Sequence, residues 1–172
     1  MSRSQDPERI GYVRNYWTSA TGTVYSYLIA DASRASRRDR RLDGGGIRGA
    51  MPAPCADLYR GCDFPPVLAV HGLGFNATYW LCLMARLYPK CTVIAVDLPN
   101  SGQSGTAAAL SVASLAADLD AFMQSLLYTQ YTVVGQGLGG LVALQMAASY
   151  TERVELVVVC STNPQPLPDA DP

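Results

Sequence analysis

The chain has 172 residues, 49% of them apolar and 16% charged, with a formal net charge of −1. This length and composition are typical of one globular domain with a buried core and exclude a chain that is disordered throughout. The near-zero net charge gives no general attraction to nucleic acid or acidic membranes, so no nucleic acid partner is expected.

Cysteine usage and the N-terminus both bear on where the protein works. The start of the chain has no apolar signal segment, and no apolar run reaches about 18 residues, so we expect no membrane span and a cytoplasmic location. The five cysteines are odd in number and irregularly spaced, which fits reduced thiols better than a disulfide framework or a metal site. We expect Cys160 to be a buried strand residue rather than a reactive thiol.

Taken in chain order, the first elements are two β-rich runs, residues 10–17 and 23–30, joined by a glycine-containing turn that predicts a hairpin. Residues 31–63 lose all periodicity and are rich in Arg, Gly and Pro, so we expect an inserted loop. The arginines at 34–48 have no interleaved aromatic residues, which favours a solvated linker over RNA, phosphorylated partners or anionic lipid. Residues 163–172 read as a proline-rich flexible tail.

Beyond the loop, strands and helices alternate. Residues 67–70 are fully apolar, as in a strand buried on both faces of a parallel sheet, and residues 92–96 are expected to form another buried strand. Asn76 or Thr78 is expected to cap one helix and Ser111 a longer one. The alternation predicts an α/β three-layer sandwich within one domain, 1–172, with a mostly parallel sheet of about six strands and an antiparallel N-terminal hairpin.

The most informative stretch, residues 131–150, joins a β-branched strand to an apolar helix through a glycine-dense turn. The turn fits the nucleophile elbow, G-x-S-x-G, in which a strained turn holds a serine above the sheet. Gly135 and Gly139 occupy its flanking positions, where strand and helix pass too close for side chains. The apex, however, is Gly137, so this elbow has no nucleophile.

The same turn also fits the dinucleotide fingerprint G-x-G-x-x-G, through Gly135, Gly137 and Gly140. That fingerprint predicts an acidic residue about 20 positions further on, to hold a ribose hydroxyl. Residues 160–162 read Cys-Ser-Thr, so the acid is missing and dinucleotide binding at residues 135–140 is the weaker interpretation. In a third interpretation, the glycines serve only close packing of helix on strand.

Three motifs stand in order along the chain: His71-Gly72-Leu73-Gly74, then Asp97-Leu98-Pro99 with Gly102 and Ser104, then the glycine-framed elbow. Together they resemble the α/β-hydrolase superfamily, in particular serine hydrolases of the esterase and lipase type. The resemblance runs from about Ile10 to Ser161 and covers the N-terminal part of a typical family domain. It implies a truncated α/β-hydrolase-like fold with no cofactor and no metal.

The resemblance also implies roles for individual residues. It places an oxyanion hole at the backbone N–H groups of Leu73 and Leu138, and it implies that His71 supports the loop rather than acting as the catalytic base. The remaining motif positions, Gly72, Asp97, Gly135 and Gly139, are structural. Asn100 of this chain stands at a position where glycine is common in the family. This is a mild departure, because asparagine tolerates the left-handed conformation.

Departures from the family pattern bear on function. Serine hydrolysis needs a nucleophile, then an acid, then a histidine in chain order, but Gly137 offers no nucleophile and the single histidine, His71, precedes it. No catalytic residue is intact. We therefore expect a relative of esterases and lipases that act on ester or acyl carbonyls, itself inactive. The alternative is a non-catalytic binding module for a small acyl-type ligand.

The last predicted strand, residues 154–160, is strongly apolar and would form an exposed edge if the fold ended there. We expect self-association, or a partner chain, to cover the edge at residues 154–159. The alternative is that the chain is a shortened form of a longer gene product.

Overall fold

The computed structural model describes residues 11–31, 64–88 and 90–163. The expected Arg-rich loop and the expected tail therefore lie almost entirely outside the described residues. The strands are β1 (Tyr12–Thr18), β2 (Val24–Ala30), β3 (Val67–Val70), β4 (Val93–Val96), β5 (Tyr131–Gln136) and β6 (Val154–Cys160). The helices are a 3-10 turn, η3 (Ala77–Trp80), and three α-helices, α2 (Leu81–Leu87), α3 (Val112–Ser125) and α4 (Leu138–Ser149).

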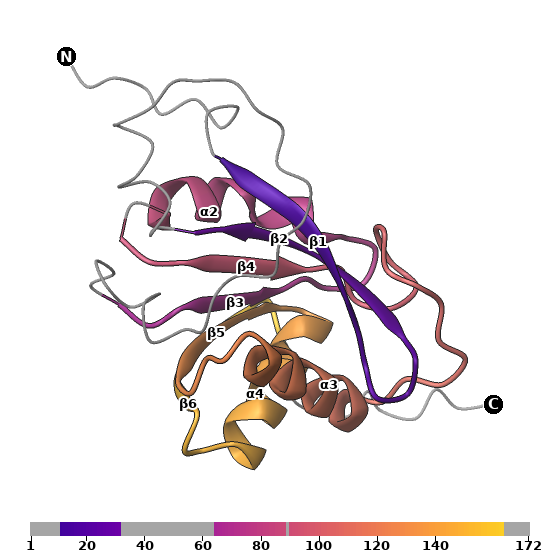
Figure 1. Cartoon of the computed structure of the whole chain (residues 1–172). Coiled ribbons are helices and arrows are strands. Elements are labelled where there is room, and N and C mark those ends of the chain that lie inside the picture. The colour runs from indigo at the N-terminus through magenta and orange to yellow at the C-terminus, as the bar shows by residue number, and fades with distance from the viewer. Residues whose placement is uncertain (1–10, 32–63, 89, 164–172) are drawn as a thin grey trace.

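The strands form one six-stranded sheet in the order β1-β2-β4-β3-β5-β6 (Figure 1). β1 and β2 are the predicted antiparallel hairpin, and β2 also pairs antiparallel with β4. The pairs β3–β4, β3–β5 and β5–β6 are parallel. The expected mixed sheet is confirmed. Because β3, β4 and β5 run parallel, their carboxyl ends, and the loops that follow them, lie at the same end of the sheet.

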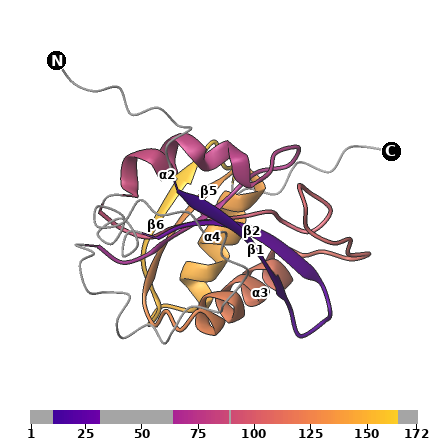
Figure 2. The ribbon, with the colours of Figure 1, turned by 45° about the horizontal axis from the view of Figure 1, so that its top comes forward.

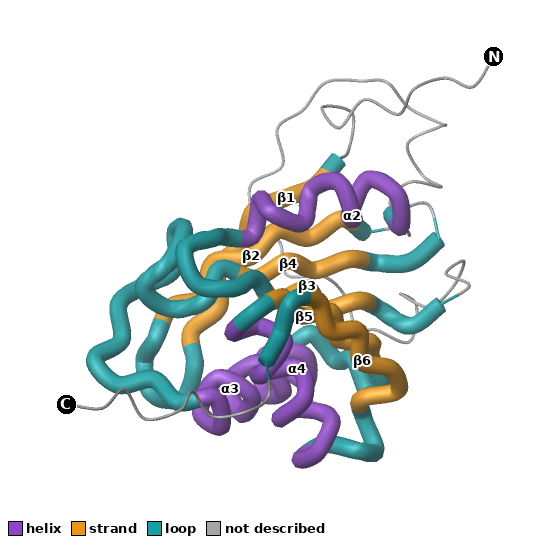
Figure 3. The backbone as a smooth tube through the Cα atoms, turned by 180° about the vertical axis from the view of Figure 1, so that it is seen from behind, coloured by secondary structure: helices purple, strands orange, loops and turns teal. Residues whose placement is uncertain are grey.

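The sheet is sandwiched between helices. In Figure 2, α2 lies on one side of the sheet and α3 and α4 on the other, and Figure 3 shows the same layers from behind. The core accordingly divides into two clusters. One joins the sheet to α3 and α4 around Phe122, Leu119 and Met146, and the other joins it to η3 and α2 around Trp80 and Met84. The three-layer architecture expected from the sequence is therefore correct.

The helix starts follow the local sequence. Ser111 caps α3 by accepting the Ser114 N–H at 3.0 Å, and the Ser114 hydroxyl in turn accepts the Ser111 N–H at 3.0 Å. The side chain of Asn76 accepts the Thr78 N–H at 2.9 Å at the start of η3. Both predicted caps are present, since these side chains satisfy N–H groups that the first helical turn leaves without partners.

A buried carboxylate ties α3 to β5 and to the turn before β6. Arg153 binds Asp120 through two N–H···O contacts of 2.7 Å each. The Tyr131 hydroxyl donates to the same carboxylate at 2.6 Å, and the Gln124 side-chain amide donates to it at 2.7 Å. Burial raises the pKa of Asp120, but the Arg153 guanidinium and these hydrogen bonds outweigh burial and hold that pKa below its usual value.

Replacing Arg153 by Met is expected to lower the free energy of unfolding by about 2 kcal/mol, because charged hydrogen bonds to a buried carboxylate are lost. This loss is at the lower end of the values for buried ion pairs because the Arg153 side chain is 32% exposed. Urea denaturation would measure it, with Arg86→Met, at an exposed position of α2, as the control. Equal losses in the two variants would contradict this role.

The outer strand β6 departs from one expectation. Cys160 is exposed, as is Cys82, whereas Cys91 is buried. The prediction of a buried Cys160 is wrong because β6 ends the sheet in the described part of the chain, and its side chains receive no cover from a further strand. Across the described ranges, no helix has the length and apolar character needed to cross a membrane.

Candidate functional site

The apex of the elbow is Gly137, between the end of β5 and the start of α4. Its backbone has φ 55° and ψ −118°, a conformation that costs a non-glycine residue about 1 to 3 kcal/mol. A Cβ added there would meet only the Gly72 Cα, at an ordinary contact distance of 3.6 Å. The apex therefore has room for a side chain, and backbone strain alone disfavours one.

The glycines around the apex have the opposite property. A Cβ on Gly135 would lie 2.2 Å from the Gly139 carbonyl oxygen, and one on Gly139 would lie 2.1 Å from the Val70 carbonyl oxygen. A Cβ on Gly140 would lie 1.8 Å from the Thr162 hydroxyl oxygen. Protein atoms thus fill the space that side chains at these positions would need. Close packing of α4 on β3 and β5 accounts for Gly135 and Gly139, and contact with Thr162 after β6 accounts for Gly140.

The loop after β3 begins with His71, which is buried and holds two segments together. Its Nδ1 lies 2.7 Å from the Gly72 carbonyl oxygen, to which it donates, and its Nε2 accepts the Leu98 N–H at 2.9 Å. Burial lowers the pKa of His71, against smaller opposing effects of the Gly72 hydrogen bond and the Asp97 charge. Both ring nitrogens of the neutral ring are therefore engaged within the protein.

This arrangement predicts a pH-dependent stability. The folded pKa of His71 lies below its unfolded value of 6.5, so its contribution is complete above that pH and is lost as pH falls towards the folded pKa. The free energy of unfolding measured by urea denaturation should therefore fall as the pH is lowered from 7.5 to 5.5. A His71→Gln variant should lack this pH-dependent loss of stability, since His71 is the single histidine. Parallel pH profiles in the two proteins would count against it.

Asp97, at the end of β4, is fully buried and gathers three segments. Its Oδ1 accepts the Ala77 N–H at 2.6 Å, and its Oδ2 accepts the Gln103 N–H at 3.0 Å and the Arg14 guanidinium at 2.7 Å. Burial raises the pKa of Asp97, but the N–H donors and the Arg14 and Ser26 side chains outweigh it and lower that pKa. The carboxylate thus organises the loops beside the elbow.

The turn after Asp97 depends on residues with positive φ. Asn100 has φ 64°, consistent with its expected tolerance of the left-handed region. Gly102 has φ 57°, and a Cβ there would come within 2.3 Å of the Asp97 carboxyl carbon. Glycine at position 102 therefore lets the loop wrap closely around Asp97.

The two residues of the expected oxyanion hole lie on two segments near the apex, the start of α4 and the loop after β3. Leu138 is the first residue of α4, so its N–H belongs to the helix turn that has no intrahelical acceptor. Leu73 lies on the loop whose Gly72 contacts the apex, and its side chain is 79% exposed. Among the described residues, the hydrogen bonds of the turns and loops include none donated by either N–H.

Two residues beside the elbow had no clear signal in the sequence. The Thr162 hydroxyl lies 3.2 Å from the Gly137 carbonyl oxygen and 3.1 Å from that of Cys160, linking the end of β6 to the apex. The Gln136 side-chain oxygen is buried against Gly72 without a hydrogen-bond partner in the described structure. Their roles depend on strand pairing that brings residues 136 and 160 together.

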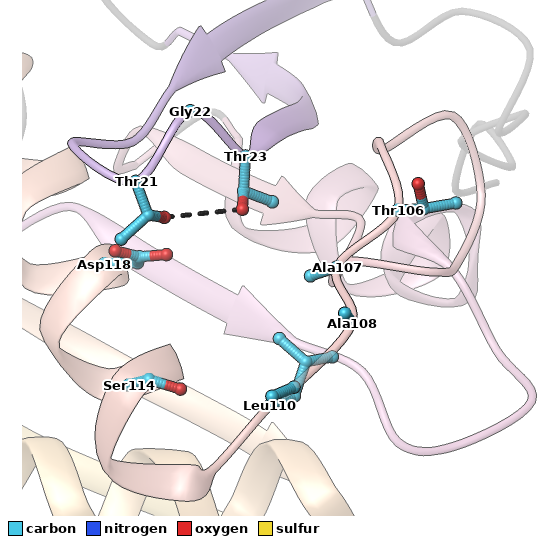
Figure 4. Close-up of a pocket in the computed structure, with 10 residues that line it drawn as sticks. Thr21, Gly22, Thr23, Thr106, Ala107, Ala108, Leu110, Ser114 and Asp118 are labelled. Carbon is cyan, nitrogen blue, oxygen red and sulfur yellow. Dashed lines mark hydrogen bonds between the residues drawn. The ribbon is translucent and has the colours of Figure 1, made fainter.

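A hollow of about 370 Å³ lies away from the elbow. It is bounded by the hairpin turn with Thr21 and Thr23, by the loop that precedes α3, and by Ser114 and Asp118 on α3 (Figure 4). Asp118 accepts the Tyr25 hydroxyl at 2.8 Å. None of the site residues expected from the sequence lines this hollow, and the described residues contain no cluster of ligands suited to a metal ion.

A sequence profile of the alpha/beta hydrolase fold matches residues 65–172, which include the His71 loop, the Asp97 turn and the elbow. The chain belongs to the alpha/beta hydrolase fold family. Family membership explains why three loops at one sheet edge converge on a strained strand-to-helix turn.

The sequence relatives include an uncharacterized protein and a methyl ester esterase. The chain is 38% identical to an uncharacterized protein of Mycobacterium tuberculosis over 98 residues, 56% of this chain and 29% of that protein. It is 37% identical to the pimeloyl-[acyl-carrier protein] methyl ester esterase of Klebsiella pneumoniae over 101 residues, 57% of this chain and 37% of the esterase.

Among solved structures, the epoxide hydrolase CorEH superposes with a TM-score of 0.69 at 19% identity, covering 94% of this chain and 46% of that one. A likeness at this identity shows the fold alone. The alignments with the two sequence relatives and with CorEH each span less than half of the other protein.

Proposed function

We propose that this chain binds the carbonyl or carboxylate oxygen of a small acyl ligand at the elbow and does not hydrolyse it. The observation that carries the proposal is the apex: Gly137 has the strained backbone of an elbow and no side chain to attack a carbonyl carbon. The chain's single histidine also lies before the elbow and has both ring nitrogens engaged by the backbone.

Two backbone amides supply the binding chemistry. Leu138 follows the apex directly and Leu73 lies on the loop after β3, and the N-terminus of a helix carries partial positive charge that attracts an anionic oxygen. In hydrolases a donor of this kind contributes about 3 kcal/mol towards a developing negative oxygen. A carboxylate carries that charge permanently, and the apex leaves open the volume that a serine side chain would fill.

An esterase or lipase ancestry supports the acyl ligand class. The Klebsiella pneumoniae relative is a methyl ester esterase, so an ester or its acid product is the group that a related elbow would receive. Dinucleotide binding at the same turn has less support, since the glycines at 135, 139 and 140 are accounted for by contacts inside the protein.

Two measurements test the proposal on the full chain, with circular dichroism confirming that each protein is folded. Neither the natural chain nor Gly137→Ser should release p-nitrophenol from p-nitrophenyl acetate faster than buffer, since a serine without a base is a poor nucleophile. In NMR, butyrate should shift the Leu73 and Leu138 amide signals saturably, whereas butanol and NAD should not.

Each opposite result contradicts a different part of the proposal. Turnover by the natural chain would show that another group, such as Cys160 or a carboxylate of the tail, performs hydrolysis. Butyrate shifts that are missing, or that spare Leu73 and Leu138, would remove the acyl-binding role. Saturable shifts with NAD would favour the dinucleotide interpretation instead.

A further inference from the structure

The hollow between the β1–β2 turn and α3 is separate from the elbow. Its walls come from three described segments: the hairpin turn at residues 21–23, the loop at residues 106–110, and the first turns of α3. Its volume of about 370 Å³ is at the lower end of the range for small-molecule sites, about 300 to 1,000 Å³. The hollow therefore has the size of a site for a small ligand.

Hydrogen bonds hold the loop wall of the hollow in place. The Gly105 N–H donates to the Val24 carbonyl at 2.8 Å, which ties the loop before α3 to the start of β2. The Asn100 side chain exchanges two hydrogen bonds of 3.0 Å each with the backbone of Ala107. The hollow is therefore largely pre-formed, as small-molecule sites usually are.

Asp118 supplies the charge of the hollow. Its Oδ2 accepts the hydroxyl of the buried Tyr25 at 2.8 Å. Burial, together with the hydrogen bond to Asp118 and the charge of Asp118, raises the pKa of Tyr25, so this hydroxyl keeps its proton and holds the carboxylate in place. Among the described residues, the side-chain hydrogen bonds include none to the other oxygen, Oδ1. The described lining contains no Lys, Arg or His to compensate the carboxylate charge.

The rest of the lining combines hydroxyl groups with an apolar wall. The Thr21 and Thr23 hydroxyl oxygens lie 3.4 Å apart on the hairpin turn, and each can accept hydrogen bonds as well as donate them. Figure 4 shows Ala108 and Leu110 across from Asp118. The hollow thus has a charged, oxygen-rich side and an apolar side.

We propose that this hollow binds a primary alkylammonium ion, with the ammonium group at Asp118 and the alkyl chain along Ala108 and Leu110. An ammonium group has three N–H donors and no acceptor, so the Asp118 carboxylate and the threonine hydroxyls are suitable partners. Hydrogen bonds between charged groups are roughly twice as strong as neutral ones. This site lies outside the elbow, so it does not depend on the acyl-binding function proposed above.

Other classes of ligand fit the hollow less well. An anion would be repelled by Asp118, with no cationic side chain in the described lining to offset the repulsion. A calcium ion takes about six to eight oxygen ligands, including carboxylates, and the described residues contain no group of three side chains suited to a metal ion. A neutral alcohol would leave the carboxylate charge uncompensated.

NMR titration of the full chain tests the site and the class of ligand. Butylammonium chloride should shift the amide signals of Gly22, Ala108 and Asp118 saturably, beyond any shift produced by sodium chloride at the same ionic strength. Butanol has the same alkyl chain without the charge, and tetramethylammonium has the charge without N–H donors. Each should bind at least about tenfold more weakly, because hydrogen bonds to a charged group are lost.

Variants test the position of the ammonium group. Asp118→Asn keeps the side-chain shape and removes its charge, so butylammonium should bind about tenfold more weakly or worse. Glu152→Gln, at an exposed position of the turn before β6, is the matched control and should bind as the natural chain does. Ala108→Phe, at an exposed loop position, places a ring in the hollow and should abolish binding without changing the circular dichroism spectrum.

The proposal has several ways to fail. Shifts that do not saturate in the natural chain, or equal affinity for butanol or tetramethylammonium, would overturn the ligand class. Unchanged binding in folded Asp118→Asn or in Ala108→Phe would overturn the position. If Asp118→Asn does not fold, Ala108→Phe alone decides, since its substitution lies on the surface.

Discussion

Gly139→Ala is expected to leave no cooperatively folded protein. Its new Cβ would lie 2.1 Å from the Val70 carbonyl oxygen and 2.7 Å from that of His71, and both are backbone atoms. β3 cannot move aside, since it pairs with β4 on one side and β5 on the other. We expect a loss on the order of 5 kcal/mol, comparable with the whole stability of many small domains.

Gly137→Ala is the matched control for this clash. Its Cβ has an ordinary 3.6 Å contact, so its cost is the strain of a positive φ, about 1 to 3 kcal/mol. Far-UV circular dichroism and urea denaturation would measure the stability of both variants. The comparison separates the cost of a steric clash at position 139 from that of backbone strain at position 137. Equal stability of the two would show that α4 does not pack as closely on β3 as described.

Asp97→Ala is expected to lower the free energy of unfolding by about 3 to 5 kcal/mol, the cost of leaving a buried charge network incomplete. The change removes the acceptor for the Ala77 and Gln103 N–H groups and for the Arg14 guanidinium. Urea denaturation would measure the loss, and hydrogen exchange of the Ala77 amide should accelerate with it.

Asp118→Ala provides the comparison, because Asp118 is half-buried and accepts a hydrogen bond from Tyr25. Its loss should be about 1 kcal/mol, the usual net value of one hydrogen bond. If Asp97→Ala costs no more than Asp118→Ala, then Asp97 does not organise the loops around the elbow, and the positions of Leu73 and Gly72 must be maintained by other contacts.

The loss of stability at low pH also depends on Asp97. The folded pKa of Asp97 lies below its ordinary value of 3.8, so its contribution is present above that pH and is lost as pH falls through the folded pKa. Asp120 behaves in the same direction. As the pH is lowered, acid unfolding should therefore come after the loss that His71 produces below about pH 6.5.

Periodicity and local chemistry in the sequence were sufficient for most of the fold. Fully apolar runs identified β3 and β4, the capping serine identified the start of α3, and alternation of strands with helices identified the layers. These features are local, since they depend on side chains within one turn or one strand. The glycine pattern likewise located the elbow, because strained turns have few sequence solutions.

Tertiary structure decided which of those residues interact. Nothing in the spacing of Asp120, Tyr131 and Arg153 indicates that they share one network, because α3, β5 and the turn before β6 meet only after the sheet has formed. The exposure of Cys160 was missed for a similar reason, since strand order, not strand composition, determines which strand ends the sheet.

The sequence by itself determined that the apex of the turn between β5 and α4 has no side chain, because that depends on one residue type, glycine, at position 137. Only the tertiary structure decided that this glycine has room for a side chain while its neighbours do not, and that both nitrogens of His71 are engaged. Those properties depend on distances between backbone segments that are far apart in the chain, which no local pattern of residues can specify.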